Sequence, residues 1–251
     1  FQIPYYVGLE DDYDMGLKFD YTGIEDLTLN FGYFRQMEPR GVPDQTARYS
    51  YDIMSVDTAS IQEMNQFNVR AAYNVTDNIE IGLSGQFGGI YNSTLDESEM
   101  STAFAGHVVA NFGNFNFKGE YIKYNYAAKN NAGNDMDVVS MGAYGFPYNV
   151  AAEASIYVAG LAYSIPVEWG PITNIQPYFD WSMINKAESN FENTVHMVPG
   201  FLISAGAIYT YVDYAIGKNN AWLGSWTNGL AAGSSDADFE SRFNINIGYY
   251  F

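Results

Sequence analysis

The sequence predicts an all-β fold, a transmembrane antiparallel up-and-down β-barrel that residues 1–251 form as a single domain. Three observations predict it. Apolar and polar residues alternate along segments of about ten residues, the length that a tilted strand needs to cross a bilayer. Short turns alternate with long polar loops, as in outer-membrane barrels. Aromatic residues form 17% of the chain and gather near the ends of the apolar faces, where a membrane interface favours rings.

The alternation is clearest at the C-terminus. Within residues 241–251, apolar side chains such as Phe243 and Ile245 fall on one face and asparagines on the other. Successive side chains of a strand point to opposite sides, so such a segment has one apolar and one polar face. Ten further segments read as strands: 13–21, 27–33, 67–73, 79–87, 102–112, 115–126, 155–165, 175–184, 194–203 and 207–217.

The connections support the same topology. Tight turns with Gly, Asn or Asp are expected at 22–25, 75–78, 113–114 and 205–206. Long polar loops are expected at 36–62, 88–101, 127–153, 185–193 and 218–240. A soluble β-sandwich would mix long and short connections at both ends, so the pattern favours a barrel.

The strand count leaves two alternatives open. If the C-terminal strand ends on the periplasmic side, residues 138–153 must be a loop and the chain supplies about eleven strands, whereas single-chain bacterial barrels have even numbers. Residues 1–8 could form a short twelfth strand, or the chain could be the latter part of a longer barrel whose first strands are missing. The absence of an opening signal peptide fits a processed or trimmed product.

The composition excludes several other classes. Charged residues form only 16% of the chain, against about 25% in soluble domains, and 22 tyrosines argue against disorder. The net charge of −18 would repel phosphates, so nucleic acid is not expected as a partner. The absence of cysteine removes disulfides, thiolate zinc sites and cysteine nucleophiles. Residues 195–212 are apolar but contain Pro199 and Gly200 and alternate, so they do not read as a spanning helix.

Four segments carry a resemblance to a known family. Residues 242–251, which end in Phe251, resemble the terminal strand by which bacterial outer-membrane proteins are handed to their insertion machinery. Residues 8–16, 166–171 and 209–215 resemble Gram-negative porins related to the phosphate-selective porin O/P group, with the chain as about the last two-thirds of such a porin. The resemblance implies a sixteen-stranded barrel, commonly a homotrimer, that passes small anions. Because no Arg and Lys ladder for anions is found here, no binding residue is carried over.

Side-chain parity selects the charges that would face the pore. The inward set is Lys18, Arg70, Lys118, Lys186, Arg242, Asp14, Asp20, Glu80, Glu120, Asp180 and Asp213. Cations and anions nearly balance in this set, which predicts weak selectivity, and the acidic remainder on loops and rims would favour cations at low salt. The alternative is that these charges simply pair across neighbouring strands.

The uncharged loop at 138–152 is the candidate constriction. Its aromatic and apolar residues, among them Met141, Tyr144, Phe146 and Tyr148, are of types that are seldom exposed to solvent as a group. We expect the loop either to fold into the lumen, to pack at a subunit contact, or to pack onto other loops outside the barrel.

Other chemistry is weakly indicated. Acidic loops around 10–14, 96–99 and 134–137 offer oxygen ligands for Ca²⁺ or Mg²⁺, including bridges to lipopolysaccharide, but none has the spacing of a dedicated site. His107 and His196 have no serine motif beside them, so no enzyme and no cofactor are expected. The sequence therefore predicts an outer-membrane porin, a passive diffusion channel for small hydrophilic solutes or ions, or alternatively a non-conducting outer-membrane barrel with a structural or surface-interaction role.

Overall fold

The computed structural model describes residues 3–9, 15–36, 51–143, 146–224 and 228–251. Its main feature is a twelve-stranded sheet in which eleven strands follow one another in chain order and each pairs antiparallel with the next. The strands of this path are β1 (Met15–Ile24), β2 (Leu27–Gln36), β4 (Ile61–Thr76), β5 (Ile79–Asn92), β6 (Glu97–Phe112), β7 (Phe115–Asn125), β10 (Glu153–Tyr163), β12 (Ile172–Lys186), β13 (Thr194–Ala205), β14 (Ile208–Lys218) and β15 (Glu240–Tyr249). All eleven predicted strands are present, so the all-β, up-and-down prediction is confirmed.

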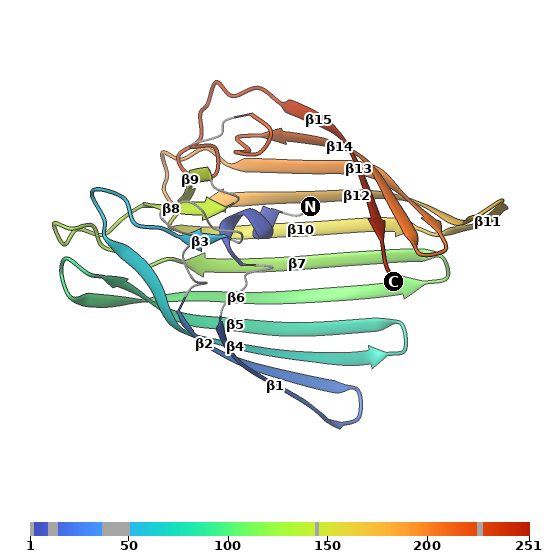
Figure 1. Cartoon of the computed structure of the whole chain (residues 1–251), viewed down its shortest axis with the longest axis horizontal. Coiled ribbons are helices and arrows are strands. Elements are labelled where there is room, and N and C mark those ends of the chain that lie inside the picture. The colour runs from blue at the N-terminus through green and yellow to red at the C-terminus, as the bar shows by residue number, and fades with distance from the viewer. Residues whose placement is uncertain (1–2, 10–14, 37–50, 144–145, 225–227) are drawn as a thin grey trace.

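The sheet curves around a concave face. Figure 1 shows the short turns at one end of the strands and the long loops at the other, as the sequence predicted. The short turns depend on residues that accept a positive φ, among them Asp26 at 62°, Gly113 at 58° and Gly206 at 62°. Within the described residues β1 and β15 each pair with a single neighbour, so the sheet is curved but not closed.

The structure differs from the predicted wall at two places, a loop that is shorter than expected and a strand that was not predicted. Residues 88–101 were expected to be a long loop, but β5 continues to Asn92 and β6 begins at Glu97, so only a tight turn separates them. The extension is stable because Ile90 is buried and the Asn92 side chain donates to the carbonyl of Lys129, 2.9 Å away. The other difference is β11 (Ile165–Trp169), which pairs only with β12 and prolongs its short-turn end.

The N-terminal segment is not a twelfth strand. Ile3–Val7 forms a 3-10 helix, η1, whose Ile3 and Val7 are fully buried against the inner faces of β10 and β12. The Ile3 amide lies 3.4 Å from the Ser182 hydroxyl oxygen of β12. Pro4 lacks an amide hydrogen and so suits the first turn of a helix better than a sheet ladder. The expectation of a short ascending strand at residues 1–8 is therefore corrected.

Residues 138–153 do not cross the wall, as predicted, but they are not an irregular loop. Val138–Ala143 (β8) and Phe146–Ala151 (β9) form a hairpin, and Asp52–Ile53 (β3) adds to it to give a separate three-stranded sheet. In Figure 1 this small sheet and η1 lie over the concave face, toward the long-loop end.

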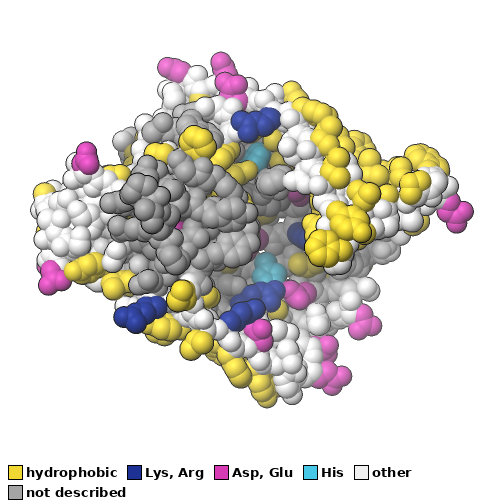
Figure 2. All heavy atoms as spheres, in the orientation of Figure 1, with side chains coloured by type: hydrophobic (Ala, Val, Ile, Leu, Met, Phe, Trp, Pro, Cys, Tyr) yellow, Lys and Arg dark blue, Asp and Glu magenta, His cyan; other side chains and the backbone are white. Residues whose placement is uncertain are grey.

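The two faces of the main sheet differ in character. Large apolar side chains on its outer face are exposed, for example Leu17 at 78%, Leu83 at 71% and Ile247 at 69%. Figure 2 shows apolar side chains along β15 and along the lower edge, where β1 lies. A continuous apolar surface of this kind is typical of a wall that faces lipid rather than water. No described segment forms a helix that is long and apolar enough to cross a membrane.

The predicted aromatic girdle at the short-turn end is exposed on this outer surface. Its members Tyr21, Tyr73, Phe112, Phe115, Tyr163, Tyr249 and Phe251 are all exposed. Aromatic rings with polar tips are stable at membrane–water interfaces, so their position agrees with the sequence prediction.

Candidate functional site

A row of polar side chains crosses the concave face over five consecutive strands, and we call it the polar ladder. Its members are Lys18, Asp20, Asn30, Arg70, Glu80 and His107. Lys18 Nζ lies 3.4 Å from Asp20 Oδ2, and Asn30 Nδ2 donates to Asp20 Oδ1 over 2.6 Å. Arg70 Nη1 reaches Asn30 Oδ1 at 3.5 Å and Arg70 Nη2 lies 3.1 Å from Glu80 Oε1. Arg70 and Glu80 thus pair across neighbouring strands, the alternative that the sequence left open, whereas Lys18 and Asp20 pair along β1.

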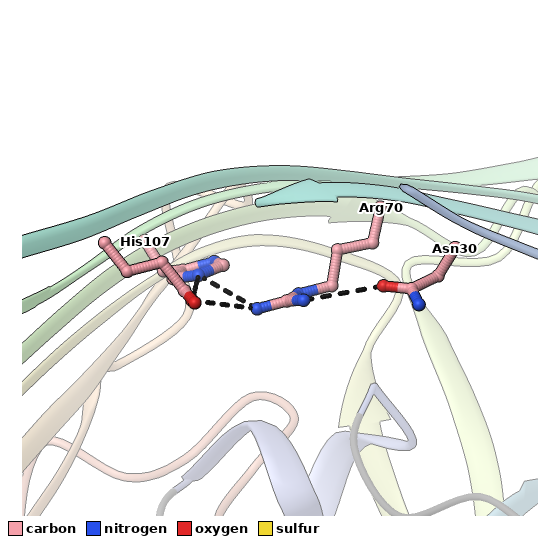
Figure 3. Close-up of polar contacts among 4 residues, drawn as sticks. Asn30, Arg70 and His107 are labelled. Atoms are coloured by element: carbon pink, nitrogen blue, oxygen red, sulfur yellow. Dashed lines mark hydrogen bonds and ion pairs between the residues drawn. The ribbon is translucent and has the colours of Figure 1, made fainter. Parts of the chain in front are cut away.

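Strand register brings the ladder together. Asn30 of β2 pairs with Arg70 of β4, and Gly82 of β5 pairs with His107 of β6. A Cβ atom on Gly82 would lie 2.2 Å from Cε1 of His107, so only glycine leaves room for the imidazole to lie across β5. Figure 3 shows the resulting group beneath the curved sheet, with Arg70 between Asn30 and His107.

His107 is held by charged neighbours rather than by a nucleophile. Its Nε2 lies 3.1 Å from Glu80 Oε1 and 3.3 Å from Arg70 Nη2. A neutral ring with Nε2 unprotonated accepts from Arg70, and a protonated ring donates to Glu80. Among the described residues no hydroxyl side chain hydrogen-bonds to His107, so the geometry does not assemble a hydrolase triad around it.

Two cavities lie along the concave face. One of about 280 Å³ is lined by Lys18, Arg70 and Glu120 together with neutral and aromatic side chains. The other, of about 420 Å³, lies toward the short-turn end and is lined by Lys118, Asp180 and Asp213. The structure thus places eight of the eleven predicted inward charges in three groups, which are the polar ladder and these two cavities.

The long-loop end of the concave face is filled by a compact body that we call the plug: η1, β3, the β8–β9 hairpin and residues 219–233, as far as these are described. Its core packs against inner-face side chains such as Ile122, Ile156 and Ile184. Three tyrosine hydroxyls donate to backbone carbonyls across it: Tyr124 to Ala151 at 3.0 Å, Tyr126 to Val7 at 2.5 Å and Tyr148 to Tyr6 at 2.7 Å. The hairpin therefore packs against the inner face of the wall and not on loops outside it.

The candidate constriction residues take different positions in the plug. Met141 and Tyr148 are fully buried in its core, while Phe146 is 52% exposed. Tyr144 lies outside the described residues. Of the three candidates that the structure describes, only Phe146 is thus exposed at the surface of the plug.

Lys186 does not line an open pore, which corrects the sequence prediction. It is only 6% exposed, and its Nζ donates to the carbonyl of Gly229 over 2.8 Å. The neighbouring Thr194 hydroxyl lies 3.0 Å from the same oxygen and 3.1 Å from the carbonyl of Asn219. Both side chains clamp residues 219–233 to the wall. Parity alone assigned Lys186 to the inner face and could not show that a distant loop covers it.

Arg242 lines a smaller space beside the plug. This cavity of about 150 Å³ also contacts His196 and Trp222. His196 is 3% exposed, and both of its ring nitrogens lack a hydrogen-bond partner among the described residues. His196 stacks loosely on Tyr6 of η1, with ring centroids 6.2 Å apart, so it belongs to the contact between wall and plug.

Sequence reasoning missed several neutral residues of the inner face. Asn30, Gln176, Tyr178 and Tyr211 share the inward parity of the charged residues that were selected. The same parity would have found them, because neutral amides and phenols on a polar face carry the same signal as charges. The role of Gly82 had no sequence signal, since it depends on the register of two strands.

The acidic loops are placed only in part. Glu97 and Glu99 lie beside Lys129, and the hydrogen bond that the Lys129 ammonium donates to Glu99 raises the pKa of that ammonium. Residues 10–14, including the predicted inward Asp14, lie outside the described residues. In the part of the chain that is described, no three His, Asp or Glu side chains are grouped closely enough to hold a metal ion.

Comparison with known proteins identifies the fold. No family model and no curated protein matches the chain. Among solved structures, the outer membrane channel DcaP of Acinetobacter baumannii is similar, with a TM-score of 0.57 and 10% sequence identity. The alignment covers 92% of this chain and 60% of that chain. LpxR from Salmonella typhimurium aligns over 94% of this chain and 88% of that one, at 9% identity and a TM-score of only 0.34.

The likeness to DcaP shows the fold alone, because the sequence identity is low. Together with the strand topology it confirms the predicted class, an outer-membrane type of β-barrel wall. The narrower resemblance to the phosphate-selective porin O/P group is not confirmed.

Proposed function

We propose that this chain forms the wall of an outer-membrane porin, a passive channel for small hydrophilic solutes or ions. The observation that carries the proposal is the contrast between the two faces of one curved sheet. The outer face exposes apolar side chains, and the concave face carries the polar ladder and two cavities lined by charged residues. A wall with lipid on one side and water on the other requires this arrangement.

The plug supplies the constriction in this proposal. It occupies the long-loop end of the concave face, and its buried tyrosine hydrogen bonds hold it against the wall. Solutes would pass between the plug and the polar part of the wall, where weak charge selection acts because inward cations and anions nearly balance and two ion pairs, Lys18–Asp20 and Arg70–Glu80, form among them.

The open sheet edges determine what must complete the barrel. In the part of the chain that is described, β1 and β15 each have one unpaired edge, and such backbone groups are too costly to leave in lipid, so we infer that further strands pair with both edges. We propose that these strands belong to the same polypeptide, and that barrels associate as homotrimers in contact with lipid and lipopolysaccharide. Mass spectrometry of the natural polypeptide tests the first point, since a mass well above 28.0 kDa is expected.

Planar-bilayer recording tests the function. The natural polypeptide, purified in detergent and reconstituted, is expected to give stepwise ohmic conductance. A membrane that stays silent after verified insertion would contradict the porin proposal.

A specific observation favours a second candidate, a non-conducting barrel with a structural or surface-interaction role. Among the described residues, twenty-four buried hydrophobic residues form one cluster that joins plug and wall and fills this part of the concave face. In that case bilayers stay silent, and deletion of residues 138–151 is expected to create conductance where none existed.

A further inference from the structure

The cavity of about 420 Å³ at the short-turn end of the concave face is lined by tyrosine, amide and charged side chains. It lies away from the plug, on β7, β10 and β12 to β15, and its volume falls within the about 300–1,000 Å³ typical of small-molecule sites. The side chains that matter to its chemistry are Lys118, Gln176, Tyr178, Asp180, Tyr211 and Asp213. We call it the tyrosine cavity.

The aromatic part of the cavity offers flat apolar surfaces with polar tips. Tyr178 and Tyr211 face each other edge to face, with ring centroids 6.4 Å apart, and Tyr211 is 37% exposed. Gly200 opposite them is required, because a Cβ atom there would lie 2.6 Å from Cζ of Tyr178 and 2.7 Å from Oδ1 of Asp213. The glycine therefore leaves room for the Tyr178 ring and the Asp213 carboxylate.

The charges of the cavity are largely satisfied within it. Asp213 accepts a hydrogen bond from the Tyr178 hydroxyl, and the Asn244 amide lies 3.4 Å from its other oxygen. Lys118 and Asp180 face each other across Gly160, to which both are paired in the strand register. One lysine and two aspartates leave the cavity with a formal charge of −1, so a phosphate finds no uncompensated cation there, and the carboxylate of Asp213 is already hydrogen-bonded by neutral groups.

Neutral groups are left to recognise a solute. Gln176, Asn116 and Asn246 line the same cavity, and amides and phenols both donate and accept hydrogen bonds. Hydroxyl groups of a solute also donate and accept, while the apolar faces of a sugar ring match the face of a phenol ring. We propose that the tyrosine cavity is a subsite for neutral polyhydroxylated solutes of the saccharide class; this rests on the proposed porin function and names its solute.

Block of ionic current by a sugar tests the proposal. With the natural polypeptide in a planar bilayer, maltotriose is expected to reduce ion current in a saturable way. Gln176→Leu and Tyr211→Ala are each expected to weaken this block about three- to tenfold, the effect of losing one hydrogen bond or one ring contact. Gln86→Leu is the matched control, because Gln86 lies on the same concave face but in the other cavity. The conductance without sugar shows that each variant has folded and inserted.

The outcomes separate this inference from the porin proposal. A conducting channel that maltotriose does not block, or that inorganic phosphate or spermidine blocks instead, overturns the inference and leaves the porin. If the channel is silent, calorimetric titration of maltotriose into the detergent-solubilised protein decides: binding that Gln176→Leu weakens and Gln86→Leu does not supports the subsite, and absence of binding overturns it.

Discussion

At the scale of the residue, single atoms decide how the concave face is organised. Gly82 has no side chain, and His107 occupies the space that a Cβ atom would need. The imidazole then reaches Glu80 and Arg70 on the neighbouring strands. Because these three groups share their hydrogen bonds, a change at the glycine disturbs all of them.

We expect Gly82→Ala to destabilise the folded barrel by about 1–3 kcal/mol, the usual cost of overpacking a filled site. Urea unfolding in lipid vesicles measures it. Gly106→Ala is the control, since a Cβ atom there would lie at ordinary contact distances, 3.5 Å from Cδ2 of Leu83 and 3.9 Å from the carbonyl oxygen of Gly82. Equal stability of the two variants would show that the His107 position is not required for folding.

The contact between Lys186 and Gly229 is a second case in which one residue decides the local structure. The Lys186 ammonium is buried and donates to the carbonyl of Gly229. Lys186→Ala removes that bond and leaves a cavity, so residues 219–233 should detach from the wall more readily. Limited proteolysis is expected to cut this loop faster in the variant, whereas Lys18→Ala, at an exposed position, should leave the rate unchanged.

At the scale of the element, the β8–β9 hairpin shows where strands that are too short to cross the membrane are placed, which is inside the curved sheet. Each of its strands has six residues, too few for a tilted crossing of a bilayer. Its apolar side chains, Val139, Met141 and Val150 among them, are nevertheless fully buried, because they pack on the inner face of the wall. The hairpin thus closes off part of the space that the curved sheet surrounds.

Tyr148→Phe tests the hold of the hairpin. The variant loses the hydrogen bond to the Tyr6 carbonyl, worth about 0.5–1.5 kcal/mol, and keeps the ring contacts. More frequent transitions between conductance levels are expected in single-channel records. Tyr157→Phe on the exposed outer face is the control, and identical gating of both variants would show that the Tyr148 hydrogen bond does not hold the hairpin in place.

At the scale of the whole molecule, charge is distributed unevenly. The chain carries a net charge of −18, but the inward side chains nearly balance and many of them are paired. Most of the negative charge therefore lies on loops and rims. Such charges act on a passing ion only over a Debye length, about 30 Å at 0.01 M salt and about 3 Å at 1 M.

We expect cation preference at low salt that fades at high salt. Reversal potentials under a KCl gradient measure it, with a cation-to-anion permeability ratio above one near 0.01 M and close to one near 1 M. Selectivity that does not depend on salt would place the selecting charge inside the pore instead. Asp180→Asn removes one negative charge from the tyrosine cavity and so tests whether the selecting charge lies there.

The sequence by itself determined the strands, their order and the face that each side chain takes. Alternation with a period of two is a local property, so eleven wall strands could be predicted from Tyr21, Phe112, Ile245 and their neighbours without knowledge of distant contacts. It also determined that Arg70, Glu80 and Asp213 lie on the polar face. These properties need only the geometry of an extended chain.

Only the tertiary structure decided what occupies the space inside the sheet. The burial of Lys186, the helical turn at Ile3–Val7 and the placement of the β8–β9 hairpin depend on contacts between residues far apart in the chain. The fit of His107 over Gly82 depends on strand register in the same way. Local alternation carries no information about such contacts, because a side chain that points inward can meet either water or the plug.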